Sequence, residues 1–225
     1  MIVCINIMEI KPIAYIENDY KEKFGVPRQS GLVSLISTIR FLPEFSDPNA
    51  LRGLEEFTHI WLIWEFSEID DRTFSPTVRP PRLGGNVRKG VFGTRSPFRP
   101  NPLGLSVVKL EETGHGYIKV SGADLMNGTP IYDIKPYLPY IDSIPDASDG
   151  WSLATKESLL TVNFPEELLS AIPEEKRAGL IETLAQDPRP QYQNSPERIY
   201  TMSFAGYQIS FVVSQDVLTV ISLRV

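Results

Sequence analysis

The sequence predicts a mainly β protein in two parts: a β-barrel domain over residues 1–150 and a small α+β domain over residues 151–225. Up to about residue 145, short β-branched and apolar runs alternate with glycine and proline, and no amphipathic helix intervenes. Many short strands at such spacing favour a closed or strongly curved antiparallel sheet. Beyond the polar stretch "PDASDGWSLATKESL" the pattern changes to helical spacing and then returns to strands.

The strands of the first part are expected within short runs bounded by turn residues. The run Thr58 to Phe66 is apolar at most positions, which is typical of a strand buried on both faces. Asn127-Gly128 is a strong signal for a tight turn. The remaining strands are expected within "KPIAYIEN", "LVSLISTIRFL", "LSVVKLEE", "YIKVSGADLMN" and "TPIYDIKPYL".

The second part is expected to contain two short helices and closing strands. Apolar side chains recur at helical spacing, and Pro173 is expected to split them into two helices. The runs "RIYTMSFAGYQISFVVS" and "VLTVISLRV" read as strands around a turn at Gln215-Asp216. The apolar positions are Leu168, Leu169, Ile172, Leu180, Ile181 and Leu184.

Composition excludes several classes of protein. Of 225 residues, 42% are hydrophobic and 22% charged, which supports a packed core and argues against global disorder. The single cysteine, Cys4, excludes an internal disulfide and a cysteine-based zinc cluster, and two histidines are too few for a histidine-rich metal site. The apolar runs are too short to span a membrane, and the start shows no signal-peptide cleavage site. We therefore expect a cytoplasmic protein without a metal.

The charge is distributed unevenly along the chain. The net charge of −6 argues against a generic nucleic-acid binder. Residues 72–110, however, contain eight basic and no acidic residues, so the rest of the chain contains 14 basic and 28 acidic residues. This separation favours a local anion-binding face; the alternative is a chance cluster spread over opposite faces of a sheet.

The stretch "GVFGTRSPFRPNPLGLS", residues 90–106, is predicted to be a stiff loop between two strands. Its three prolines fix the backbone and remove amide donors, so it suits neither a helix nor a central strand. The loop would hold Arg95, Phe98 and Arg99 in nearly fixed positions and lose little entropy on binding a ligand. The alternative is a structural loop whose arginines pair with nearby carboxylates.

Five separated stretches resemble the TsaA-like family: "YKEKFGVPRQSG", "RGLEEFTHIWLIWEF", "PTVRPPRLGGNVRKGVFGTRSPFRPNPLGLS", "NGTPIYDIKPYLPY" and "AQDPRPQY". The resemblance implies a β-barrel methyltransferase that uses S-adenosyl-L-methionine and acts on tRNA. It implies N6-methylation of threonylcarbamoyl-adenosine at position 37, just 3′ of the anticodon, in threonine tRNA. It also implies a homodimer. The family fold accounts for the absence of a glycine-rich dinucleotide fingerprint.

The resemblance also implies cofactor contacts. By charge, Arg28 or Arg95 would bind the cofactor's carboxylate, and Glu68 its ribose hydroxyls. The family commonly has aspartate where this chain has Asn127, and its best-known member has His-Gln in place of Ser67-Glu68. Asparagine still accepts a hydrogen bond but lacks the negative charge. The implied contacts are Pro27, Arg28, Gln29, Ser67, Glu68, Arg95, Leu105, Asn127, Gly128, Thr129 and Pro130.

Methylation of an exocyclic amine benefits from a proton acceptor, and Asp133 and Asp187 are the candidates. The alternative for each is a solvated or turn-stabilising aspartate. The substrate base must leave the anticodon stack, so aromatic side chains are expected to hold it: Phe98, Tyr137 and Tyr192 are candidates.

RNA contacts are expected from both parts of the chain. In the basic stretch the candidates are Arg82, Arg88 and Arg99, which would meet phosphates. In "QDPRPQY" they are Arg189 and Tyr192, so the second domain is expected to serve mainly RNA selection. Two alternatives remain open: a non-catalytic RNA-binding module, and a methyltransferase with a different acceptor.

Overall fold

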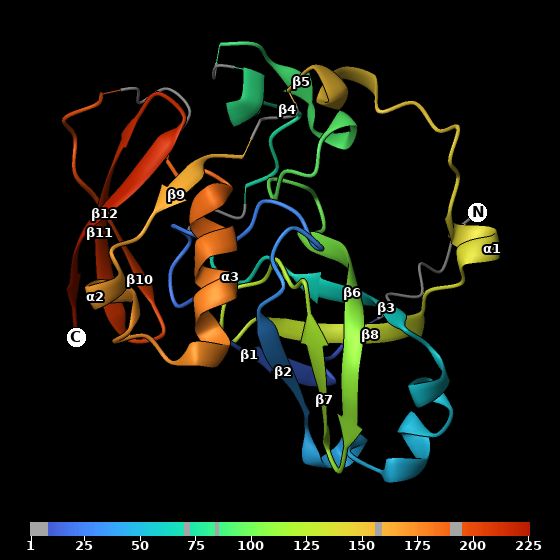
Figure 1. Cartoon of the computed structure of the whole chain (residues 1–225). Coiled ribbons are helices and arrows are strands. Elements are labelled where there is room, and N and C mark those ends of the chain that lie inside the picture. The colour runs from blue at the N-terminus through green and yellow to red at the C-terminus, as the bar shows by residue number, and fades with distance from the viewer. Residues whose placement is uncertain (1–8, 70–72, 84–85, 156–158, 190–194) are drawn as a thin grey trace.

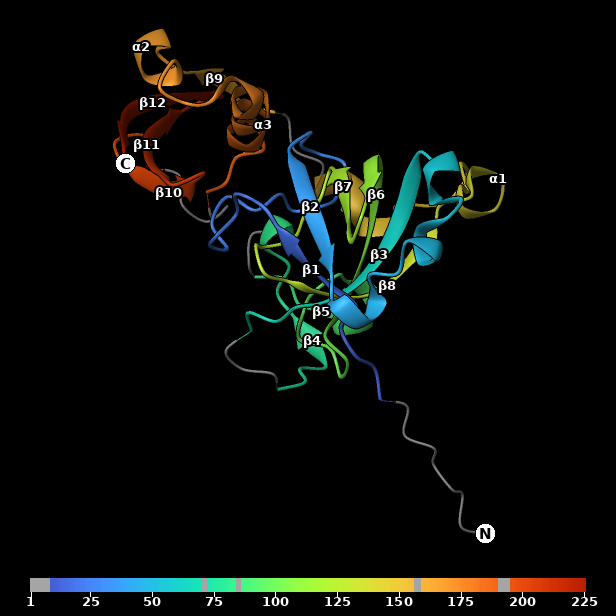
Figure 2. The same cartoon turned by 90° about the horizontal axis from the view of Figure 1, so that it is seen from below.

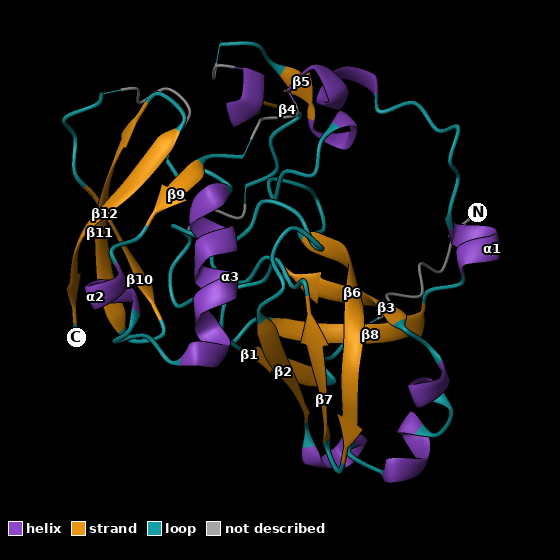
Figure 3. Ribbon diagram, viewed as in Figure 1, coloured by secondary structure: helices purple, strands orange, loops and turns teal. Residues whose placement is uncertain are grey.

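The computed structural model describes residues 9–69, 73–83, 86–155, 159–189 and 195–225. Strands dominate it, and helices are short except for one in the C-terminal domain (Figure 3). The expected mainly β fold, a barrel followed by a small α+β unit, is confirmed (Figure 1).

The N-terminal domain is a closed antiparallel barrel with the strand order β1-β2-β7-β6-β3-β8 (Figure 1). β8 pairs with β1 and closes the sheet, which leaves no barrel edge open to pair with another chain. The bounds are β1 Ala14–Glu17, β2 Ile36–Phe41, β3 His59–Glu65, β6 Leu103–Gly114, β7 Tyr117–Ser121 and β8 Pro130–Pro136.

The barrel interior is filled by side chains. In β3 the buried residues alternate: Ile60, Leu62 and Trp64 point inward. Trp61 and Ile63 are half-buried on the outer face, so the expectation of a strand buried on both faces is wrong. An apolar run reads the same whether its outer face is buried or only half-covered. The packed interior means that a ligand must bind outside it.

The C-terminal domain is a sheet with the order β10-β11-β12-β9, beside helix α3 (Figures 1 and 2). Pro173 separates α2 from α3, and Gln215, with φ of 53°, lies in the turn between β11 and β12; both expectations are confirmed. β9 pairs parallel to β12 and was not expected, because its three residues are too few to show a period. The bounds are β9 Thr161–Asn163, α2 Glu166–Leu169, α3 Glu174–Ala185, β10 Tyr200–Phe204, β11 Tyr207–Ser214 and β12 Val217–Arg224.

Several short elements lie outside the barrel sheet. β4 pairs with β5 at the start of the proline-rich loop, and α1 follows β8. Their bounds are β4 Thr77–Val78, β5 Lys89–Gly90 and α1 Pro139–Asp142, and 3-10 turns cover Pro43–Phe45, Pro48–Leu51, Leu54–Glu56, Pro81–Leu83, Val91–Gly93 and Gly150–Thr155.

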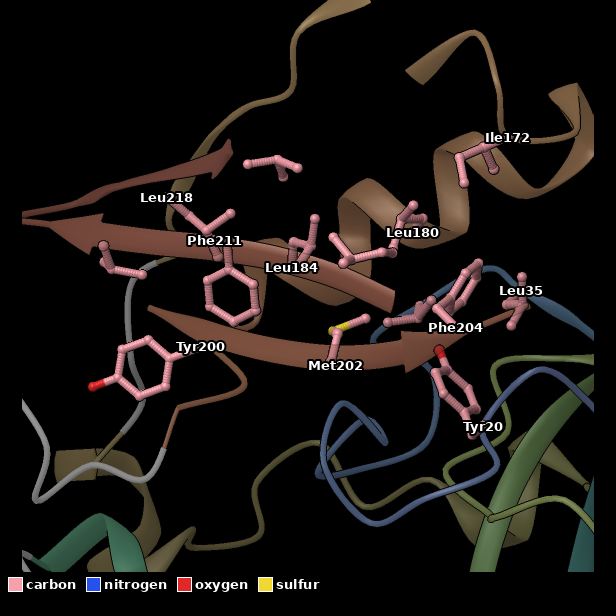
Figure 4. Packing of buried hydrophobic residues seen from close by; sticks show 14 residues of the cluster. Tyr20, Leu35, Ile172, Leu180, Leu184, Tyr200, Met202, Phe204, Phe211 and Leu218 are labelled. Carbon is pink, nitrogen blue, oxygen red and sulfur yellow. The ribbon is translucent and has the colours of Figure 1, made fainter. Parts of the chain in front are cut away.

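Residues 18–35, which connect β1 to β2, are packed into the core of the C-terminal domain. Tyr20, Val33 and Leu35 belong to the same buried cluster as Leu180 and Phe204, and Figure 4 shows Tyr20 and Leu35 reaching that cluster from the barrel side. The Tyr20 hydroxyl lies 3.0 Å from Thr183 Oγ1, and burial raises the pKa of Tyr20 to about 12. This connection is therefore shared by the two domains.

Polar contacts reinforce the shared connection. Glu182 Oε2 accepts hydrogen bonds from the Ser34 amide at 2.6 Å and from its hydroxyl at 2.8 Å. Lys176 Nζ lies 2.7 Å from Asp19 Oδ1. The Ser203 amide donates to Glu22 Oε1 at 2.6 Å. The C-terminal domain thus makes polar contacts with the connection near both of its ends.

Helix α3 approaches this connection at a glycine. A Cβ atom at Gly179 would lie 2.9 Å from Leu35 Cδ1 and 3.1 Å from its Cβ. We predict that Gly179→Val lowers the free energy of unfolding by about 1–3 kcal/mol through overpacking. Ala178→Val, at the neighbouring exposed position of the same helix, should cost about 0.5 kcal/mol, as expected from helix propensity. Urea unfolding measures both free energies. If the two variants lost equal free energy of unfolding, the close contact between Gly179 and Leu35 would be contradicted.

Candidate active site

The stretches implied to contact the cofactor leave the barrel at the same end. The register places Glu65, the end of β3, opposite Leu103, the start of β6. Trp64 lies opposite Ile131 near the start of β8, and β7 ends at Ser121 opposite the start of β2. Chain segments far apart in the sequence therefore converge around this end of the barrel.

The loop Pro27–Gln29 meets Arg95 directly. Gln29 Oε1 accepts a hydrogen bond from Arg95 Nη1, and Gln29 Nε2 donates to the Arg28 carbonyl at 2.5 Å. Arg95 is exposed. The structure thus brings together two of the stretches that the sequence analysis proposed independently, and it presents a guanidinium to solvent between them.

Asp124, which the sequence analysis missed, joins these stretches. Its Oδ1 accepts from Ser106 Oγ at 2.6 Å, and Ser106 Oγ accepts from Trp64 Nε1 at 3.0 Å. Burial raises the pKa of Asp124, and this effect outweighs the hydrogen bonds and the nearby charge of Arg95. The signal in the sequence was an aspartate between the apolar residues of "SGADLMN".

The turn Asn127–Pro130 is tied to the same region. Asn127 Oδ1 accepts from the Asn18 amide at 3.0 Å, and the Asn127 amide donates to the Tyr20 carbonyl at 2.8 Å. Gly128 has φ of 81°, a conformation that favours glycine, and the expected tight turn is confirmed. An aspartate at position 127 would accept the same bond, so this departure from the family preserves the turn.

Ser67 and Glu68 form the turn that follows β3, and Glu68 is exposed. The preceding residue, Phe66, donates its amide to the Pro102 carbonyl at 2.9 Å, so this turn lies against the end of the proline-rich loop. The loop and the turn therefore form adjacent parts of one surface.

Leu105 and Asp133 share the outer face of the barrel. Both lie directly opposite Ile63, on the strands that flank β3, so their side chains project to the same side. Two strand spacings separate their backbones by about 10 Å. Leu105 is 55% exposed, and Asp133 Oδ2 lies 2.8 Å from Lys135 Nζ at the surface. Asp133 thus lies within reach of a ligand that covers Leu105.

Asp187 and Arg189 form a bidentate ion pair. Arg189 Nε and Nη2 lie 2.8 Å from Asp187 Oδ1 and Oδ2 respectively, and the Arg189 side chain is only 10% exposed. The backbone carbonyls of these two residues accept hydrogen bonds from Arg28 Nη2, at 3.0 Å and 3.2 Å. Arg28 is therefore engaged with the C-terminal domain, whereas Arg95 is open to solvent.

The basic stretch divides into supporting and exposed arginines. Arg99 Nη1 donates to the carbonyls of Val91 at 3.0 Å and Thr94 at 2.8 Å, and its guanidinium lies 5.6 Å from the Phe92 ring centroid. It braces the loop by bonding to carbonyls. Arg88 is exposed and donates to Thr77. The side chain of Arg82 and all of Tyr192 lie outside the described residues.

The two other aromatic candidates lie at opposite ends of the barrel. Phe98, in the proline-rich loop, is 41% exposed at the end where the cofactor stretches meet. Tyr137 follows the far end of β8 and contacts the rings of His59 and Trp61. A surface hollow at that far end is lined by Pro48, Arg52 and other residues outside the candidate site. Phe98 is thus the better placed of the two.

Within the described residues, no three His, Cys, Asp or Glu side chains are grouped so that they could hold a metal ion. No helix in the described ranges combines the length and apolarity needed to cross a bilayer.

Residues 15–143 match the family model of the tRNA-methyltransferase O N-terminal domain, and residues 157–225 match that of the TrmO C-terminal domain. The chain belongs to the tRNA-methyltransferase O family. Among its relatives, the tRNA (adenine(37)-N6)-methyltransferase of Escherichia coli is 43% identical over 200 residues, which are 84% of this chain and 85% of that protein. The enzyme of the same name from Eikenella corrodens is 46% identical over 163 residues, 71% of this chain and 92% of that one.

The fold of this family member matches solved structures. The crystal structure of TrmO from Pseudomonas aeruginosa shares 32% identity with a TM-score of 0.79, and the match covers 97% of this chain and 99% of that one. The resemblance identified from the five motifs is confirmed, and so is the expectation of a methyltransferase family.

We predict that Asp124→Asn raises the melting temperature at pH 7. The pKa of Asp124 is higher in the folded protein than in the unfolded chain, so folding favours the neutral carboxyl. The contribution of this group to stability is therefore lost as the pH rises through the folded pKa. Asparagine mimics the neutral form. The advantage of the variant, followed by thermal unfolding, should therefore shrink as the pH falls and Asp124 itself becomes protonated.

Asp142→Asn provides the control of opposite sign. Hydrogen bonds from the Leu138 amide and from the Trp61 indole hold the pKa of Asp142 below its usual range. That variant should be less stable than the wild type at pH 7, with the difference again closing in acid. If both variants changed the melting temperature at pH 7 in the same direction, the opposite pKa shifts given for Asp124 and Asp142 would be contradicted.

Proposed function

We propose that this chain is an S-adenosyl-L-methionine-dependent methyltransferase that methylates N6 of threonylcarbamoyl-adenosine at position 37 of threonine tRNA. The observation that carries the proposal is the convergence of the family's cofactor stretches at one end of the barrel, in a chain that matches both domains of the family. The two relatives named above support the adenine at position 37. The threonylcarbamoyl group and the tRNA species rest on the motif resemblance.

The residues at this end of the barrel fit the proposed cofactor. Arg95 offers an exposed guanidinium for a carboxylate, and exposed Glu68 suits the hydroxyls of a ribose. Leu103 and Leu105 are 37% and 55% exposed and offer apolar surface to a base. When bound, S-adenosyl-L-methionine supplies an electrophilic methyl group. The protein's task is then to align the acceptor nitrogen, which provides much of the catalysis in a transfer of this kind.

Asp133 and Asp187 remain the candidates for the proton acceptor. Asp133 projects from the same face as Leu105, and its side chain is 45% exposed. Its oxygens accept from the Ile134 amide at 2.9 Å and pair with Lys135 at 2.8 Å. Both carboxylate oxygens of Asp187 accept bonds from Arg189, and the Asp187 side chain is 23% exposed. The greater exposure therefore favours Asp133, which would take the proton that the amine loses on methylation.

Basic residues of the stretch 72–110 would bind the tRNA. We propose that Arg82, Arg88 and Arg99 attract its phosphates, Arg99 from within the loop that it braces, and that Phe98 and Tyr192 stack on unstacked bases. Arg189 was expected to contact RNA, but its side chain is 10% exposed and paired with Asp187. The enzyme is proposed to act in the cytoplasm as a homodimer, which sedimentation of the purified protein would test.

The decisive experiment supplies labelled S-adenosyl-L-methionine and total tRNA to the purified protein and identifies the products by nucleoside mass spectrometry. tRNA with and without the threonylcarbamoyl modification forms the two arms. Label in N6-methylated threonylcarbamoyl-adenosine, absent from the unmodified arm, is expected. Label in another nucleoside would mean that the enzyme methylates a different acceptor. If the protein did not bind the cofactor at all, the alternative of a non-catalytic RNA-binding module would be favoured.

Arg95→Ala is predicted to weaken the binding of S-adenosylhomocysteine by about 2–4 kcal/mol, because removing the arginine leaves a carboxylate without its charge partner. Calorimetric titration measures the loss. Arg52→Ala is the matched control, since Arg52 is an arginine near the opposite end of the barrel. If both variants bind with wild-type affinity, Arg95 does not hold the cofactor.

A further inference from the structure

The turn after α3 has a defined and uncommon geometry. Asp187 has φ of 51°, a left-handed conformation that favours glycine. Among the other residues, aspartate and asparagine adopt it most readily. Its carboxylate takes two parallel hydrogen bonds from Arg189, and the Arg189 amide contacts the same group at 3.3 Å. A bidentate pair of this kind fixes orientation as well as distance. The backbone of this turn is therefore held in one shape.

That shape presents backbone carbonyls to the cofactor loop. Arg28 Nη2 donates to the carbonyls of Asp187 and Arg189, across 159 and 161 positions of sequence. The Arg28 carbonyl in turn accepts from Gln29 Nε2, and Gln29 Oε1 accepts from Arg95. A continuous chain of hydrogen bonds thus runs from the C-terminal domain through Arg28 and Gln29 to Arg95.

We propose that this turn completes the cofactor site: Asp187 and Arg189 are positioning residues that act through Arg28 to hold the loop Pro27–Gln29 against Arg95. The inference rests on the proposed function, because it takes this loop as the cofactor loop. It assigns to the C-terminal domain a part in cofactor binding that is independent of RNA.

Burial and pairing favour this role over the two that the sequence suggested. A proton acceptor must be accessible to the amine, and the Asp187 side chain is 23% exposed with its two oxygens held by the buried guanidinium of Arg189. An RNA contact needs an exposed guanidinium, and the Arg189 side chain is 10% exposed. Contact with Arg28 requires neither, since it uses the backbone of the turn.

The test measures S-adenosylhomocysteine binding by calorimetry in the absence of RNA, alongside the melting temperature of each variant. Asp187→Ala and Arg189→Met should each weaken binding at least tenfold at a temperature where the variant is fully folded. Asp187→Asn, which tolerates the left-handed backbone and keeps one acceptor oxygen, should restore most of the affinity. Should Arg189→Met fail to fold, Arg189→Lys keeps the charge without the bidentate geometry and carries the test.

A double-mutant cycle identifies Arg28 as the intermediary. If the turn acts through Arg28, Arg28→Ala combined with Asp187→Ala should bind no more weakly than Arg28→Ala alone. Lys176→Met removes a different contact between the C-terminal domain and residues 18–35, the ion pair with Asp19, and should change the affinity less than twofold.

The outcomes separate this inference from the proposed function. A wild-type protein that does not bind S-adenosylhomocysteine would overturn the proposed function itself. Wild-type binding together with unchanged affinity in Asp187→Ala and Arg189→Met would overturn the role of the turn. Additive losses of binding free energy in the double-mutant cycle would also overturn the role of the turn, because they would mean that the turn and Arg28 act separately.

Discussion

The burial of residues 18–35 in the C-terminal core is the contact on which the arrangement of the site depends. Complete burial of an apolar or aromatic side chain contributes about 1.5–3 kcal/mol, and Tyr20, Val33 and Leu35 are all buried there. The ion pair between Lys176 and Asp19 is partly exposed, and such pairs contribute at most about 1 kcal/mol. Apolar packing therefore anchors this connection, and the polar contacts fix its course over the surface of α3.

The filled barrel explains why the site is built from loops. Ile60, Leu62 and Trp64 from β3 are buried and help to fill the interior that a ligand would otherwise enter. The groups that could bind one are consequently at the strand ends, where backbone is free to depart from the sheet pattern. Proline stiffens one of these loops, Arg99 braces it from within, and Asp124 joins it to its neighbours. Stiffness of this kind lowers the entropy lost on binding.

Sequence patterns predicted the elements whose signals are local. The split of the helices at Pro173, the turn at Gln215 and the barrel strands follow from residues close together in the chain. The motifs likewise identified the family. The role of Arg28 could not be predicted in this way, because its partners lie 159 and 161 positions away, and the Asp124 network joins residues on three separate elements. The Arg28 contacts form only once the two domains have packed, and the Asp124 network forms only once the barrel has folded.

The loop around Arg28 is restrained from both domains. On the barrel side, the Gly31 amide donates to the Gly122 carbonyl at 2.8 Å, and on the other side Arg28 donates to the turn at Asp187. The Arg28 bond joins a charged group to a backbone carbonyl, and hydrogen bonds of this type are stronger than those between neutral groups. With two anchors within four residues, the intervening backbone has little freedom left. A movement of the turn at Asp187 would therefore be transmitted to Gln29 and Arg95, which makes the relative position of the two domains a determinant of cofactor affinity.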